Sequence, residues 1–140
     1  SCFVNIVEEM ELNLYPESQR SVLFDLLSYA NKIELNRLVL TTHSPYVINY
    51  LTLAAKAFLL TQKISANETL QERIKEVVPA DSAIDPARLR IYELKDGGVF
   101  RLSTYEGLPS DENFLNIQLG VTNELFDQLL EIEQEFDYKN

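Results

Sequence analysis

The fold of this chain is decided first by Phe3-Val4-Asn5-Ile6-Val7-Glu8-Glu9-Met10-Glu11, a short apolar run that ends in three carboxylates. Residues 3–7 are short, rich in β-forming side chains and bounded by charge, a pattern typical of a buried strand. Adjacent carboxylates at the mouth of a buried strand repel one another, and a metal cation commonly offsets that cost. The stretch therefore predicts a strand that ends where a ligand could bind.

A second buried strand is predicted within residues 36–42, and it leads into Thr41-Thr42-His43-Ser44-Pro45. Between the two strands, Pro16 suits the first turn of a helix. The apolar residues of that helix recur at helical spacing and are Val22, Leu23, Leu26, Leu27 and Ala30. A strand, a helix and a strand in this order predict parallel pairing through a crossover connection.

Three charged or titratable residues follow these two strands directly. In an open α/β sheet, ligands bind beyond the carboxyl ends of the strands. Glu8 and Glu9 follow the first strand, and His43, the single histidine of the chain, follows the second. We therefore expect them to share one edge of the sheet, where they would suit phosphate and magnesium chemistry.

The rest of the chain predicts further helices and a hairpin. Ser44-Pro45 favours a helix start with a capping hydroxyl, and Thr41 and Thr42 are interpreted as strand residues. The helix that follows has an apolar face of Val47, Leu51, Ala55, Phe58 and Leu59. Later segments are predicted as a surface helix over 68–78, a strand over 89–94, an Asp-Gly hairpin turn over 95–98, a return strand over 99–105, a short helix over 111–119 and an amphipathic helix over 122–136.

Composition limits the function classes. The 140 residues are 46% hydrophobic, enough for a core, and carry 12 basic against 22 acidic side chains for a net charge of −10. No basic stripe is present, which argues against nucleic-acid binding by this segment. One cysteine and one histidine exclude a disulfide framework and a zinc site of the usual ligand count. No apolar run is long enough to span a membrane, and we expect a cytoplasmic location.

The run from Ile6 to Gln19 resembles the Walker B motif and D-loop of ABC-type ATPases. Residues 38–48 are similar to the switch-histidine segment of the same ATPases, in the branch that contains the structural-maintenance-of-chromosomes proteins, RecF-like repair ATPases and overcoming-lysogenization-defect nucleases. The resemblance implies an α/β fold with part of a P-loop-NTPase-type parallel sheet. It divides the chain into an ATPase-core part, residues 1–62, and a part made of a polar insertion, hairpin and C-terminal helix, residues 63–140.

The resemblance also implies roles for individual residues. Glu8 would hold Mg²⁺ through a water molecule, and Glu9 would be the general base that polarises the attacking water. His43 would contact the γ-phosphate of ATP. Glu11 and Asn13 lie in the D-loop equivalent, which in the family reaches the partner subunit of a head-to-tail dimer where ATP is bound. Gln19 is interpreted as a residue that caps its helix or faces solvent.

Several departures from the family pattern bear on activity. Met10 replaces the usual proline and Tyr15 the usual histidine of the D-loop. The phosphate-binding motif G-x-x-x-x-G-K-[S/T] and a Leu-Ser-Gly-Gly-like signature are both missing from the 140 residues. Because the backbone and lysine of that motif hold the nucleotide phosphates, we expect this chain to be the C-terminal portion of a larger ATPase and to be inactive alone.

Two other interpretations remain open at this stage. The chain could be a non-catalytic interaction module whose acidic residues are relics. It could instead contain part of a Toprim-like metal nuclease, because Glu106-Gly107 is followed by Ser110-Asp111-Glu112. The strand before Glu106 is amphipathic and no Asp-x-Asp pair follows, so this motif is weak.

Overall fold

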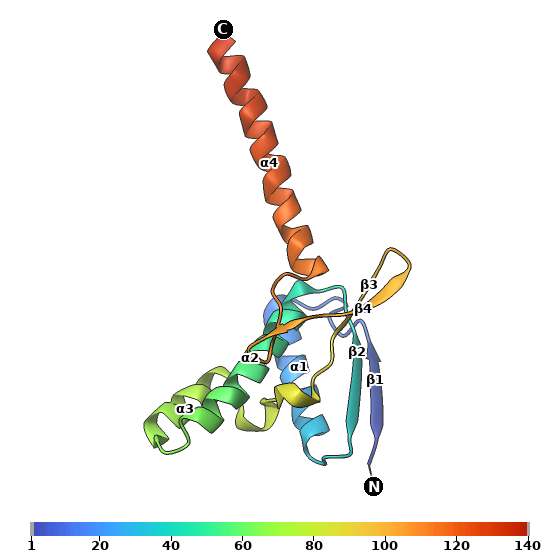
Figure 1. The fold of residues 1–140 in the computed structure, drawn as a ribbon, viewed down its shortest axis with the longest axis vertical. Coiled ribbons are helices and arrows are strands. Elements are labelled where there is room, and N and C mark those ends of the chain that lie inside the picture. The colour runs from blue at the N-terminus through green and yellow to red at the C-terminus, as the bar shows by residue number, and fades with distance from the viewer. Residues whose placement is uncertain (1, 140) are drawn as a thin grey trace. The chain divides into compact units, whose positions relative to one another are not determined.

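The structure is a computed structural model that describes residues 2–139. The chain forms two compact units, residues 1–110 and residues 111–140. In the first unit, the strands β1 (Val4–Glu8) and β2 (Arg37–Thr41) pair in parallel, with Val4 opposite Arg37 and Glu8 opposite Thr41. Helix α1 (Pro16–Asn31) connects them, and helix α2 (Pro45–Lys63) follows β2 (Figure 1). The predicted α/β class is therefore confirmed, with a short parallel sheet, flanking helices and antiparallel hairpins.

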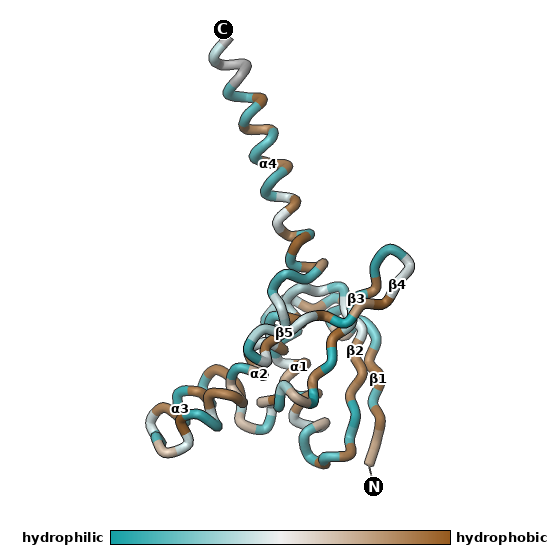
Figure 2. Tube along the Cα trace, in the orientation of Figure 1, coloured by the Kyte–Doolittle hydropathy of each residue, from teal (hydrophilic) through white to brown (hydrophobic). Residues whose placement is uncertain are grey.

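The core lies on one face of this small sheet. Its buried apolar residues come mostly from α1 and α2 and are Met10, Leu23, Phe24, Leu27, Val47, Leu51, Ala54, Ala57 and Val78. Val7, Leu38 and Leu40 of the strands pack against this cluster. Apolar residues lie along both strands (Figure 2), and several of them are exposed and not packed in this core.

The prediction that both strands are buried is wrong for one face of the sheet. The side chains of Val4 and Ile6 are each 65% exposed, and that of Val39 is 47% exposed. Side chains alternate between the two faces of a strand, and α1 and α2 cover only one face. The apolar run correctly predicted strands, but among the described residues only alternate side chains are covered.

The remaining elements of the first unit are short. Helix α3 (Glu68–Val77) is followed by the 3₁₀ turns η1 (Ala80–Ser82) and η2 (Pro86–Arg88), then by the hairpins β3 (Tyr92–Lys95)–β4 (Gly98–Arg101) and β5 (Thr104–Tyr105)–β6 (Leu108–Pro109). The predicted Asp-Gly turn is confirmed, since Asp96 and Gly97 have φ angles of 50° and 73°. The predicted return strand is interrupted because Leu102 turns into the interior, where its N–H donates to the Ile91 carbonyl at 2.9 Å.

The second unit is dominated by one helix, α4 (Phe114–Lys139). The sequence pattern predicts two separate helices, over 111–119 and 122–136, but in the structure one continuous helix runs through Gly120. A glycine inside a helix costs only about 1 kcal/mol relative to alanine, so the helical pattern on both sides prevails. Among the residues that the structure describes, no helix combines the length and apolar character needed to cross a membrane.

Candidate functional site

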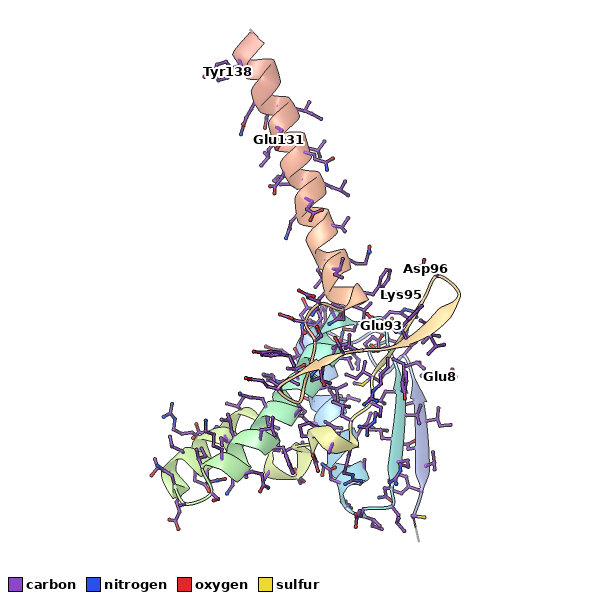
Figure 3. The ribbon with its side chains drawn as sticks, in the orientation of Figure 1. Glu8, Glu93, Lys95, Asp96, Glu131 and Tyr138 are labelled. Atoms are coloured by element: carbon purple, nitrogen blue, oxygen red, sulfur yellow. The ribbon has the colours of Figure 1, made fainter. Side chains whose placement is uncertain are left out.

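The candidate residues lie beyond the carboxyl ends of β1 and β2. The register pairs Glu8 with Thr41, so both strands end at the same edge of the sheet. Figure 3 labels Glu8 at this end of β1. The Glu9 N–H then donates to the Thr41 carbonyl at 3.0 Å and lies 3.2 Å from Thr41 Oγ1. The end of the first strand is thus fastened to the end of the second.

Glu9 has an unusual backbone conformation. Its φ angle is 47°, in the left-handed region. This region costs a non-glycine residue on the order of 1–2 kcal/mol, and such residues cluster at functional sites. The two contacts to Thr41 on one side and the burial of Met10 in the core on the other hold Glu9 in this conformation.

The side chains of Glu9 and His43 lie together. His43 Nε2 is 3.3 Å from Glu9 Oε1, and the two side chains are 84% and 43% exposed. A pair so exposed contributes little to the free energy of folding. The imidazole and the carboxylate are therefore available to a ligand at the strand ends.

Glu11 contacts the His43 segment of its own chain. Its Oε1 accepts a hydrogen bond from the His43 backbone N–H at 2.6 Å. Its Oε2 is buried and has no hydrogen-bond partner among the described residues. Asn13, the other predicted D-loop residue, is exposed and has a φ angle of 60°, which asparagine tolerates better than most residues.

A buried polar pair that the sequence did not predict lies behind this loop. Gln19 is 7% exposed, contrary to the expectation that it caps its helix or faces solvent. Its Nε2 donates to the Leu14 carbonyl at 3.0 Å, and its Oε1 accepts from Ser44 Oγ at 2.6 Å. The sequence did contain a signal, because Gln19 lies four and eight residues before Leu23 and Leu27, on the apolar stripe of the helix.

The predicted role of Ser44 is also corrected. Ser44 occupies the N-cap position of α2, but its hydroxyl makes no capping hydrogen bond. The hydroxyl is instead used by Gln19, while the Ser44 N–H donates to Thr42 Oγ1 at 2.9 Å. Thr42 therefore belongs to the turn after β2 and not to the strand.

The carboxylates at this edge of the sheet could supply only some of the ligands of a magnesium ion. Among residues 2–139, no three acidic, cysteine or histidine side chains converge as they would around a metal ion. Mg²⁺ in nucleotide sites is usually held by one or two carboxylates together with substrate phosphates and water. Glu8, at the exposed end of β1, can supply one such ligand, and the phosphates would supply others.

Glu106, the nuclease candidate, belongs to no cluster of metal-binding side chains among the residues that the structure describes. Glu106 and Gly107 have φ angles of 51° and 80° and make the two-residue turn between β5 and β6. Positive φ angles at both central residues are what a type I′ hairpin turn requires. The Glu-Gly pair is explained by hairpin geometry.

A separate cleft of about 440 Å³ lies between α1, α2, α3 and η1, away from the candidate residues. Polar side chains that line this cleft form hydrogen bonds between α1 and the segment of η1. Ser28 Oγ donates to Asp81 Oδ2 at 2.7 Å, and Asn31 Nδ2 donates to the carbonyls of Asp81 and Ala83 at 2.8 and 2.9 Å. These groups already have partners within the fold.

Residues 4–49 match the family model described as "AAA domain, putative AbiEii toxin, Type IV TA system". The match runs from β1 to the start of α2 and includes the candidate residues at the ends of β1 and β2, but not Glu106. No curated protein and no solved structure matched the chain. The family match supports an AAA-type, ATPase-related segment in this part of the chain.

Proposed function

We propose that this chain supplies the catalytic-base and γ-phosphate-contacting part of an ABC-type, Mg-dependent ATPase site. In this proposal Glu8 would hold Mg²⁺, Glu9 would orient the attacking water and accept its proton, and His43 would donate a hydrogen bond to the γ-phosphate. The observation that carries it is the 3.3 Å contact between Glu9 and His43 beyond the ends of two parallel strands.

The arrangement suits phosphoryl transfer for physical reasons. The transition state spreads negative charge over the phosphoryl oxygens, so catalysis depends on positioned donors and on a carboxylate that orients the nucleophile. Glu9 and His43 offer an acceptor and a donor within one contact distance of each other. A water molecule held by Glu9 and a phosphate oxygen bound by His43 would therefore be neighbours.

The phosphate-binding part of the proposed site would come from outside these 140 residues. The 140 residues contain no phosphate-binding loop, so the nucleotide phosphates would be held by other residues of the full-length protein. By itself this chain should bind Mg-ATP feebly, because Mg²⁺ is rarely held without substrate phosphates. Micromolar affinity in a calorimetric titration of the 140-residue chain would contradict this division of the site.

The proposed dimer contact falls on the exposed part of the loop after β1. Glu11 is directed to His43 of its own chain. Asn13 is exposed, as are its neighbours Leu12 (60%) and Tyr15 (84%). We assign contact with a second copy, in a head-to-tail homodimer, to Asn13 and these neighbours.

The test is a matched pair of glutamate-to-glutamine variants in the full-length protein. Glu9→Gln keeps the shape of the side chain but removes the base, so turnover should fall at least ~100-fold while nucleotide affinity is retained. Glu17→Gln makes the same chemical change at an exposed residue in the first turn of α1 and should leave turnover unchanged. Wild-type turnover in Glu9→Gln would show that Glu9 is not the base.

A further inference from the structure

Two loops meet at the candidate site. We call residues 9–15 the first loop and residues 42–44 the second loop; they follow β1 and β2. His43 lies in the second loop. Its own N–H is hydrogen-bonded to Glu11 of the first loop, and the next residue, Ser44, is hydrogen-bonded to Gln19 of α1. These bonds bracket a side chain that is itself almost fully exposed.

The first bond involves a charged acceptor. Glu11 Oε1 accepts from the His43 N–H at 2.6 Å. Hydrogen bonds to ionised groups are shorter and roughly twice as strong as those between neutral groups. This bond fixes the backbone from which the imidazole extends.

The second bond is buried. Ser44 Oγ donates to Gln19 Oε1 at 2.6 Å, and both residues are only 7% exposed. Gln19 belongs to α1 and also donates to the Leu14 carbonyl of the first loop at 3.0 Å. One side chain therefore connects the helix, the first loop and the residue that follows His43.

Among the described residues, the His43 imidazole contacts one side chain, that of Glu9, at 3.3 Å, and 84% of the His43 side chain is exposed. Its direction is therefore set by its backbone, which Glu11 and Ser44 hold from either side.

We propose that Gln19 and Glu11 are positioning residues that hold His43 against Glu9 and make the two loops move as one unit. The importance of this placement for catalysis rests on the proposed function. The placement itself is a property of the 140-residue chain and can be measured without nucleotide. A purely structural polar pair would stabilise the fold without controlling His43.

The chain offers a matched control for the buried bond. Ser82, at 2% exposure, donates its hydroxyl to the Phe24 carbonyl at 2.9 Å. Ser44→Ala and Ser82→Ala each delete one buried hydroxyl and leave one acceptor without its donor. Each should lower the melting temperature by about 3–6 °C, the effect expected for one buried hydrogen bond in a domain of this size.

The readout that separates the two variants is nuclear magnetic resonance of His43. It is the single histidine in the sequence, so its ring signals are unambiguous in the 140-residue chain. Ser44→Ala should shift these signals and speed exchange of the His43 amide proton about tenfold, as expected when local opening becomes easier. Ser82→Ala should leave both unchanged.

A second variant tests the same bond from its other end. Gln19→Met keeps a side chain of similar length in the buried position and removes both amide contacts. It should reproduce the His43 changes of Ser44→Ala. Wild-type His43 signals and amide exchange in either folded variant would overturn the proposal and make the Gln19–Ser44 pair merely structural.

In the full-length protein, Ser44→Ala should lower kcat about tenfold with little change in nucleotide affinity, because the chemical step and not binding depends on His43. If His43 loosens in the resonance experiment but Glu9→Gln retains turnover, the positioning role stands and the proposed ATPase site fails. If His43 does not respond, the positioning role fails whatever Glu9→Gln does.

Discussion

Glu9 and Glu106 are both glutamates with positive φ angles, 47° and 51°, and both directly follow a strand. Glu106 is one of two central residues of a hairpin turn, and that turn demands its conformation. Glu9 follows a strand of a parallel pair and is held by contacts to Thr41, with its side chain beside His43. A positive φ angle at Glu106 is explained by its hairpin turn. At Glu9 no such turn requires it, so there the same φ angle is an indication of function.

The largest expected effect comes from making the same substitution at both positions. Asparagine tolerates the left-handed region but removes the carboxylate. Glu9→Asn in the full-length protein should lower ATP turnover by roughly 10²–10⁴-fold, the usual contribution of a positioned general base. Glu106→Asn should leave turnover unchanged. Equal losses of turnover in steady-state assays of the two variants would contradict a specific role for Glu9.

The next effect concerns the core residue that anchors Glu9. Met10 is 7% exposed and belongs to the hydrophobic core, whereas Leu12, two residues later, is 60% exposed. Met10→Ala should destabilise the 140-residue chain by about 2–4 kcal/mol, because it leaves a cavity. Leu12→Ala should change stability by less than about 0.5 kcal/mol. Urea denaturation of both variants checks this, and similar midpoints would mean that Met10 does not anchor the loop.

A smaller effect on turnover is expected from the exposed imidazole. His43→Ala should reduce ATP turnover at least ~10-fold, since it removes one donor to the developing phosphate charge. The same variant should change the free energy of unfolding by less than about 0.5 kcal/mol, because an exposed pair contributes little. A melting point lowered as much as by a core deletion, with normal turnover, would identify His43 as a structural residue.

The smallest effect is a gain in stability at the hairpin turn. Glu106→Asn should stabilise the 140-residue chain by about 0.5–1 kcal/mol, because asparagine is more easily accommodated at a positive φ angle. Thermal denaturation of this variant beside wild type measures the gain. A loss of stability would indicate that the Glu106 side chain has a role beyond occupying the turn.

The sequence predicted the elements around the site well. Apolar runs that end in polar residues identified β1 and β2, and the order of elements predicted their parallel pairing. Helix starts at Pro16 and Pro45 follow from the fixed φ angle of proline and are confirmed. These features depend on local chemistry and on periodicity, which a sequence displays directly.

The sequence did not predict which polar side chains pair across the two loops. Gln19 and Ser44 are 25 residues apart, and their bond depends on the packing of α1 against the start of α2. A capping role for Ser44 was the local expectation, and a tertiary contact replaced it. Likewise, Met10 was recognised as a departure from a family motif, but its burial depends on the shape of the core.

The proposed site is tested most directly by a structure of the full-length Glu9→Gln variant with Mg-ATP. We expect the γ-phosphate within hydrogen-bonding distance of a ring nitrogen of His43, about 3 Å, and a water molecule between residue 9 and the phosphorus atom. A nucleotide whose γ-phosphate lies away from the ends of β1 and β2, or a His43 imidazole that contacts only protein, would contradict it.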